Sequence, residues 1–162
     1  MRIRPAVTSD AETLADLFVE MEQHYGGDGN HPRSEVCSRI ERWIEEQPDA
    51  VFLLAEDETG VVIGHLSATP IFPSGGAGQR SLFVKDIYVR DNARGQGIGE
   101  ELLRSCAGEA RKRGMPRLEL TVDRANSGAE KLYARLGALD TEKTYMRWEG
   151  DSLSNLAGNS QQ

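Results

Sequence analysis

Three glycines separate a predicted strand from a predicted helix, and this junction constrains the fold more than any other stretch of the chain. Residues 80–89 (RSLFVKDIYV) have the composition of a strand, and apolar side chains recur at helical spacing from residue 98 to residue 110. Gly95, Gly97 and Gly99 fall at alternate positions at the junction. Because glycine costs order in a helix or strand, this cluster indicates a tight turn or a backbone that something approaches closely.

The rest of the chain is predicted to alternate between strands and helices. Strands are predicted at 1–7, 50–57, 61–70, 117–122 and 143–148, and further helices at 9–21, 34–47 and 127–137. A glycine-rich surface loop is predicted at 73–78. This order favours one α/β domain over residues 1–149, with some parallel strand pairing, followed by a polar tail at 150–162.

Composition excludes several classes of protein. The formal net charge of -7 argues against a nucleic-acid partner, because binding phosphates needs a clustered basic face. The two cysteines, Cys37 and Cys106, are too far apart for a metal knuckle or a redox pair, and Cys106 lies on an apolar helix stripe. The sequence shows neither a leader nor an apolar run of membrane-spanning length. We therefore expect a cytoplasmic protein without a metal site or a membrane partner.

Two phosphate-binding motifs that use glycines do not fit the junction. A dinucleotide fingerprint needs G-x-G-x-x-G, but Glu100 stands where the third glycine is required. A P-loop needs Lys and Ser or Thr before its helix, and here Glu100 and Glu101 follow Gly99. What remains is a glycine loop with Arg94 at its mouth and a helix N-terminus, whose amides and dipole suit an extended pyrophosphate. A simple helix cap would need only one glycine, not three. Because Glu100 and Glu101 would repel a phosphate if they pointed toward it, we expect both side chains to face solvent.

Residues 94–99, Arg-Gly-Gln-Gly-Ile-Gly, match the Q/R-x-x-G-x-G/A signature of the GNAT acetyltransferase superfamily, which binds acetyl-coenzyme A. The preceding KDIYV resembles the fourth strand of that family, and NSGAEKLYARLGA (126–138) resembles its later Asn-x-x-Ala…Tyr…Gly segment. The resemblance extends over about residues 2–148. It implies a mixed, twisted central sheet flanked by helices, in which a splayed pair of parallel strands binds acetyl-CoA.

The resemblance also implies a set of cofactor contacts. Backbone groups of the strand before the loop would pair with the pantetheine arm, backbone amides of the loop and first helical turn would hold the pyrophosphate, and Asn126 would line the far side of the channel. The residues concerned are Ile87, Tyr88 and Val89 in the strand, and Arg94, Gly95, Gln96, Gly97, Ile98, Gly99 and Glu100 after it.

Catalysis in this family needs a neutral amine, a stabilised oxyanion and a proton for the departing thiolate. By resemblance, the amide of Val89 would meet the oxyanion and Tyr133 would protonate the coenzyme A sulfur. Asp86 takes the family's acidic position on the strand, where it is either the general base or a structural carboxylate. Glu119, His24 and a chain of waters are alternative bases.

The acceptor is expected to be a small primary amine. KDIYV and the segment LYARLGALDTEKTYMRW resemble the diamine and polyamine acetyltransferase branch, but Lys85 stands where that branch usually carries an acid. A diamine, a polyamine and a lysine-like amino acid therefore remain open, with His24, Tyr25 and Asp28 as expected pocket residues. A protein N-terminus or lysine is the enzymatic alternative, and a non-catalytic acyl-CoA-binding regulatory domain is the alternative of another class. The family resemblance also implies a homodimer.

Overall fold

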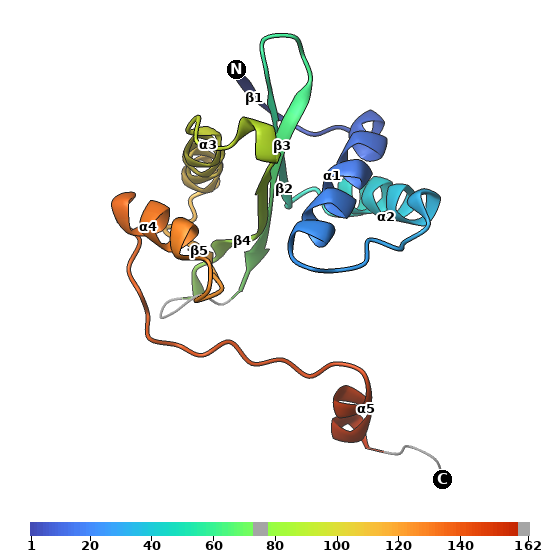
Figure 1. Cartoon of the computed structure of the whole chain (residues 1–162). Coiled ribbons are helices and arrows are strands. Elements are labelled where there is room, and N and C mark those ends of the chain that lie inside the picture. The colour runs from blue at the N-terminus through green and yellow to red at the C-terminus, as the bar shows by residue number, and fades with distance from the viewer. Residues whose placement is uncertain (73–77, 159–162) are drawn as a thin grey trace. The chain divides into compact units, whose positions relative to one another are not determined.

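One mixed sheet of five strands organises the structure, a computed structural model that describes residues 1–72 and 78–158. Its strands are β1 (Arg2–Pro5), β2 (Val51–Glu56), β3 (Val62–Ile71), β4 (Ser81–Val89) and β5 (Leu118–Leu120). The first four pair antiparallel in chain order, and β5 pairs parallel with β4 (Figure 1). The predicted mixed α/β fold class is confirmed. Except for Gly78, the surface loop predicted at 73–78 lies outside the described residues.

Helices cover both faces of this sheet (Figure 1). On one face lie α1 (Ala11–His24) and α2 (Arg33–Glu46), and on the other lies α3 (Ile98–Lys112). The core under α1 and α2 contains Leu14 and Leu17 of α1, Ile40 of α2 and Leu54 of β2, each at most 1% exposed. Burying each such side chain contributes about 1.5–3 kcal/mol, which fixes α1 against the sheet.

The apolar stripe of α3 is buried as its sequence predicts. Its buried residues are Ile98, Leu102, Leu103, Cys106 and Ala110. Burial raises the pKa of the Cys106 thiol to about 12, with a smaller contribution from Glu109. Cys106 is therefore a packing residue that stays protonated, and not a nucleophile.

The chain divides into two compact units, Met1–Leu120 and Thr121–Gln162. The first contains the sheet and its three helices. The second contains α4 (Ser127–Arg135) and α5 (Asp151–Ala157), joined by an irregular segment. The α5 helix lies in the predicted polar tail and was not expected from the sequence.

The strand predicted at 143–148 is not formed, so this prediction is wrong for the single chain. Within the described residues, the backbone of this segment hydrogen-bonds to no strand. An alternating sequence favours a strand, but the strand forms only where a neighbour pairs with its N–H and C=O groups. Among the described residues, no helix is both long and apolar enough to cross a membrane.

Candidate active site

The β4 strand separates from β5 halfway along its length. The ladder between them pairs Leu82 with Leu118 and ends at Val84 opposite Leu120. On the other side of β4, Ser67 of β3 lies opposite Asp86 while Ala68 lies opposite Val84, so Lys85 is an extra residue in a β-bulge. From Lys85 to Val89, β4 thus has no strand on its β5 side within the described part of the chain. The predicted splayed strand pair is present.

A glycine loop connects the splayed end of β4 to α3. The short 3-10 helix η3 (Asp91–Ala93) leads into it, and Gly95 and Gly97 have φ values of 76° and 81°. L side chains rarely adopt this left-handed conformation, which explains both glycines. A Cβ at either position would meet no atom within 4 Å, so open space lies beside the loop. Gly97 is the N-cap of α3 and, as a glycine, has no side chain to cap the amides of the first helical turn.

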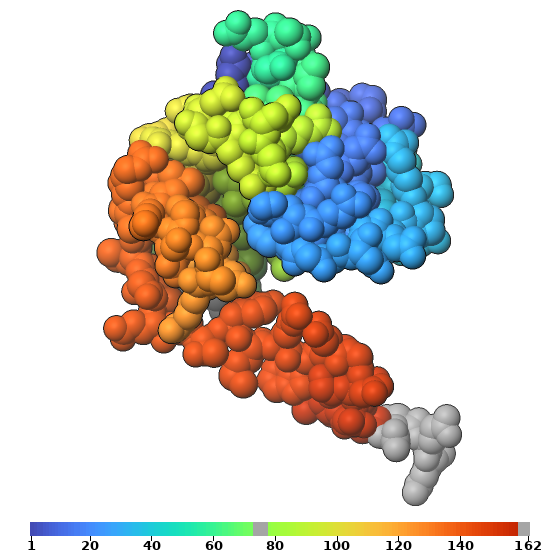
Figure 2. Space-filling view, viewed as in Figure 1, coloured from blue at the N-terminus to red at the C-terminus, as the bar shows by residue number. Residues whose placement is uncertain are grey.

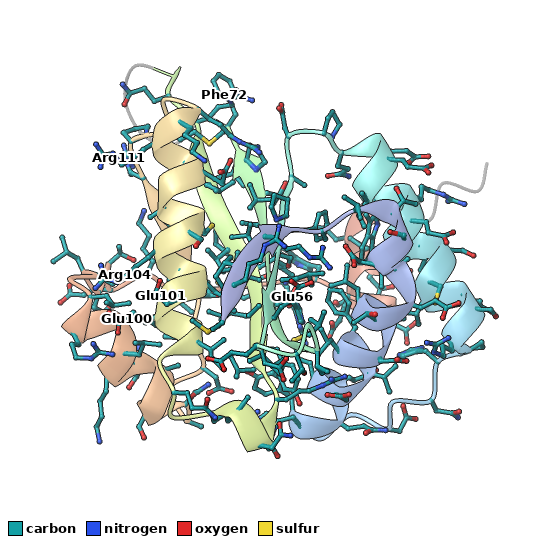
Figure 3. The ribbon with its side chains drawn as sticks, turned by 90° about the horizontal axis from the view of Figure 1, so that it is seen from above. Glu56, Phe72, Glu100, Glu101, Arg104 and Arg111 are labelled. Atoms are coloured by element: carbon teal, nitrogen blue, oxygen red, sulfur yellow. The ribbon has the colours of Figure 1, made fainter. Side chains whose placement is uncertain are left out.

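The two glutamates at the start of α3 differ in exposure. Glu101 is exposed, as expected, whereas the side chain of Glu100 is only 19% exposed. Arg104, one turn along the helix, donates from Nη2 to Glu100 Oε1 at 2.7 Å (Figure 3). This ion pair compensates the negative charge that a phosphate at the helix start would otherwise meet.

Arg94 lies at the mouth of the loop and bridges it to β4. Its Nε donates to the Val89 carbonyl at 2.9 Å, and its Nη2 lies 2.8 Å from Asp91 Oδ1. The guanidinium also lies over the Tyr88 ring, 5.6 Å from the centroid. The predicted cofactor residues of β4 and the loop are thus brought together, with Arg94 as the cation among them.

Asp86 projects from β4 toward the face covered by α1 and α2, where it accepts a hydrogen bond from Ser67 Oγ at 2.8 Å. Tyr88, two residues further on, belongs to the core of that face and is 7% exposed. Burial raises the pKa of Tyr88, as do the nearby carboxylates of Glu20 and Asp91 to a smaller extent. Tyr88 is therefore a neutral packing residue, while the half-buried Asp86 keeps a carboxylate near the splayed strand.

The end of α1 is held against the end of β4. Arg90 donates from Nε and Nη2 to the two carboxylate oxygens of Glu20 at 2.9 and 2.8 Å, and from Nη1 to the Val62 carbonyl. His24 follows one turn later, with Nδ1 3.9 Å from Asp91 Oδ1 and its ring centroid 6.2 Å from that of Tyr88. Figure 2 shows the surface of this helix end (blue) meeting the loop after β4 (yellow-green).

The three predicted pocket residues differ in their distance from this junction. His24 lies beside it, and Tyr25 stacks edge-on against His24 with ring centroids 5.2 Å apart. Asp28 lies in the loop between α1 and α2, where its Oδ1 accepts from the Asn30 amide at 3.1 Å. The structure thus brings His24 and Tyr25 to the end of β4, whereas Asp28 shapes its own loop.

Comparison with known proteins identifies the family. The sequence profile of the acetyltransferase (GNAT) family matches residues 14–138. An uncharacterized N-acetyltransferase of Bacillus subtilis is 31% identical over 137 residues, which cover 85% of this chain and 89% of that protein. The chain belongs to the GNAT acetyltransferase family.

Other GNAT relatives have named substrates. An L-methionine sulfoximine/L-methionine sulfone acetyltransferase of Pseudomonas aeruginosa is 33% identical over 137 residues, covering 83% of this chain and 78% of that one. The thialysine N-epsilon-acetyltransferase of Bos taurus is 37% identical over 83 residues, and this match spans about half the length of either protein, 49% of each. A solved structure of a probable acetyltransferase has a TM-score of 0.82 at 27% identity and covers 93% of this chain and 99% of its own.

The two GNAT residues predicted after the sheet lie in the second compact unit. Asn126 is the N-cap of α4, and its Oδ1 accepts from the Ala129 amide at 3.1 Å. Tyr133 is half-buried on α4, two turns further along. The Asn at the start of this spacing is therefore a helix N-cap, which is a local reason for an Asn at position 126.

Two residues of β3 that lie beside the splayed end of β4 were not singled out by sequence reasoning. His65 on β3 is opposite Tyr88 and 1% exposed, and neither ring nitrogen has a hydrogen-bond partner. Burial lowers its pKa to about 4, so the imidazole is neutral at neutral pH. Gly64, opposite Val89, lies so close to β4 that a Cβ would be 2.7 Å from the Tyr88 carbonyl oxygen. In the sequence both residues belong to an ordinary strand pattern, which indicates neither the buried imidazole nor the close approach of the two strands.

Proposed function

We propose that this chain transfers the acetyl group of acetyl-CoA to a primary amine of a small molecule. One observation carries the proposal: β4 loses its β5 partner at Val84 and then leads directly into a glycine loop and the start of α3. The unpaired strand edge can pair with an extended amide-containing arm, and the helix start suits a pyrophosphate. Coenzyme A carries both groups in that order.

The cofactor contacts follow from these features. We assign the pantetheine arm to the backbone of Ile87, Tyr88 and Val89, and the pyrophosphate to the amides of residues 94–100. Open space beside Gly95 and Gly97 leaves room for a phosphate to reach the backbone. Arg94 already lies at this position, where its cation can exchange the Val89 carbonyl for a phosphate oxygen. Asn126 is assigned to the far side of the channel through its side-chain amide.

Acetyl-CoA supplies an activated thioester when bound, and the chain supplies the groups that orient and stabilise the reaction. The Val89 amide is assigned to the developing oxyanion, since a fixed backbone donor there costs no reorganisation. The Tyr133 phenol is assigned as the proton donor for the departing thiolate. An alkyl amine has a pKa of about 10.4 and must lose a proton first, for which Asp86, held by Ser67, is the proposed acceptor.

The acceptor class is supported by the relatives and by the local charges. Thialysine and methionine sulfoximine, named for two of the relatives, are small amino compounds. The Asp86 carboxylate lies on β4, where it favours the approach of an ammonium group, whereas the charge of Asp91 is compensated by Arg94. We therefore assign His24 and Tyr25 to an acceptor pocket for an amino acid with a side-chain amine or a short diamine, with Asp28 of the following loop as a further candidate.

A thiol-release assay tests the proposal. The full chain is incubated with acetyl-CoA and separately with thialysine, L-ornithine, L-lysine, a diamine, a polyamine and a lysine-containing peptide. We expect release with at least one small amine and only background release with the peptide. Release with the peptide alone would make the chain a protein acetyltransferase. Coenzyme A binding without release by any amine would favour a regulatory acyl-CoA-binding domain.

A further inference from the structure

Arg94 is bound to protein groups at the end of β4, and one of those groups belongs to the splayed edge. Its Nε donates to the Val89 carbonyl at 2.9 Å, its Nη2 lies 2.8 Å from Asp91 Oδ1, and its guanidinium carbon lies 5.6 Å from the centroid of the Tyr88 ring. The side chain is 39% exposed, so a ligand from solution can reach it. Arg94 is therefore held in place by the protein but remains open to exchange with a ligand.

The Val89 carbonyl points away from β3, toward the β5 side of the splayed strand. The Arg90 amide donates to the Ile63 carbonyl at 3.0 Å, and the adjacent residue pair along the ladder is Val89 opposite Gly64. Hydrogen-bonded and non-hydrogen-bonded pairs alternate in an antiparallel ladder, so the N–H and C=O groups of Val89 face away from Gly64. The carbonyl that Arg94 binds is thus the acceptor that the end of the splayed edge offers to a ligand.

The pantetheine arm of coenzyme A competes with Arg94 for this carbonyl. Under the proposed assignment the arm pairs its amides with the edge of β4, and an amide N–H needs a carbonyl acceptor. A guanidinium is a charged donor and binds a carbonyl more strongly than an amide does. Pantetheine by itself must therefore displace Arg94 from Val89 at a cost in affinity.

A diphosphate relieves this competition. It offers the Arg94 guanidinium charged oxygens in a bidentate geometry, which is the geometry that arginine prefers. The ion pair between Arg94 and Asp91 opposes the exchange only weakly, because the Asp91 side chain is 75% exposed and exposed ion pairs contribute little. Once the guanidinium has moved to a phosphate, the Val89 carbonyl can accept from the arm.

We infer that Arg94 is a specificity-determining residue, which withholds the Val89 carbonyl from a thioester arm unless the same molecule brings a diphosphate. This assignment rests on the proposed function, because both ligand groups are those of coenzyme A. Arg94 then has two opposite effects: it attracts a diphosphate and it excludes an arm that has none. The site thereby selects acyl thioesters of the complete coenzyme against acyl thioesters of pantetheine alone.

Two fragments of coenzyme A, pantetheine and inorganic pyrophosphate, test the coupling when they are titrated separately and together into the full chain. We expect saturating pyrophosphate to tighten pantetheine binding by about tenfold, and saturating pantetheine to tighten pyrophosphate binding by the same factor. Pantetheine carries no charge, so Coulomb attraction between the fragments does not produce this effect. Independent binding of the two fragments would overturn the inference.

The variant Arg94→Met separates competition at Val89 from simple attraction of phosphate. Methionine keeps an unbranched side chain over Tyr88 but has neither a charge nor a strong donor. Without pyrophosphate, this variant should bind pantetheine about tenfold more tightly than the parent, although it binds coenzyme A more weakly. Added pyrophosphate should then have no further effect on pantetheine.

The matched control is Arg104→Met. It removes the same charge from a side chain that bonds to Glu100 on α3 rather than to β4, so its affinity for pantetheine and its coupling should equal those of the parent. If Arg94→Met bound pantetheine no more tightly than the parent, Arg94 would act only as a cation and the inference would be overturned. Failure of the parent to bind coenzyme A would instead overturn the proposed function and this inference with it. Neither titration depends on acetyl transfer.

Discussion

At the scale of single residues, two positions on β3 set the environment of the splayed strand. Gly64 and His65 lie opposite Val89 and Tyr88, the residues assigned to the pantetheine arm. Gly64 lets the strands approach closely there, and His65 fills the space between Phe18 and Tyr88 with ring centroids 4.7 and 6.3 Å away. Their effects are conformational and electrostatic and can be measured without a substrate.

His65 predicts that stability falls with pH below neutral. Its pKa is about 4 in the folded chain and 6.5 when unfolded, so the unfolded state binds more protons between these values. Stability is therefore complete above pH 6.5 and declines as the pH falls toward 4. Urea unfolding should give a lower free energy of unfolding at pH 4.5 than at pH 7, and His65 should account for roughly 2–3 kcal/mol of the difference.

The variant His65→Phe should lack this part of the pH dependence, because it keeps the aromatic packing without a titrating group. His31→Asn is the matched control, since His31 is exposed, and it should keep the dependence of the parent. An unchanged pH profile in His65→Phe would show that some other group titrates.

Gly64→Ala and Gly108→Ala should change stability in opposite directions. A Cβ on Gly64 would be 2.7 Å from the Tyr88 carbonyl, so β3 must move and the free energy of unfolding should fall by roughly 1–3 kcal/mol. A Cβ on Gly108, inside α3, would meet nothing within 4 Å, and alanine there should stabilise by roughly 0.5–1 kcal/mol. Chemical denaturation measures the free energy of unfolding of both variants. A change of the same sign in both would contradict the close approach of Gly64 to the Tyr88 carbonyl.

At the scale of elements, the glycine loop and α3 were well predicted because their signals are local. Gly95 and Gly97 are required by backbone conformation, and the apolar stripe from Ile98 to Ala110 has a clear helical period. All four predicted helices form with ends within three residues of their predicted positions. The β-bulge at Lys85 was not predicted, because it depends on how β4 pairs with a distant strand.

Gly97 at the start of α3 and Gly114 just after its end form a matched pair for testing whether the glycine loop binds coenzyme A. Gly97→Ala and Gly114→Ala both force alanine into a left-handed conformation, at φ 81° and 66°, and both face open space. Each should destabilise the chain by about 1–2 kcal/mol. Only Gly97→Ala should weaken coenzyme A binding, by about tenfold or roughly 1.4 kcal/mol, because only it lies beside the assigned pyrophosphate site. Calorimetric titration decides this, and equal losses in both variants would remove the loop from the binding site.

At the scale of the whole molecule, the family and the fold class were predictable from sequence, although the pairing of the last predicted strand was not. The signature at 94–99 and the segment from Asn126 to Ala138 resemble the family within one sequence, and the family is confirmed. The strand expected at 143–148 was wrong for the single chain because pairing partners are not encoded by local alternation. The positions of the catalytic and pocket residues remain predictions.

Tyr133→Phe should separate catalysis from binding. Removing the phenolic proton donor should lower kcat by about a hundredfold or more, with coenzyme A affinity unchanged. Tyr145→Phe, a tyrosine 64% exposed in the same compact unit, should leave kcat unchanged. An unaltered kcat in Tyr133→Phe would remove this residue from the acid role without affecting the assigned cofactor site.

The central claim is that acetyl transfer to an amine takes place at the splayed end of β4. The most direct measurement quantifies, in one reaction with acetyl-CoA and a single small amine, both the free coenzyme A and the acetylated amine. The proposal predicts that the two accumulate in equal amounts and that Gly97→Ala slows both together at subsaturating acetyl-CoA. Coenzyme A release without acetylated amine, or no release with any primary amine while coenzyme A still binds, would contradict it.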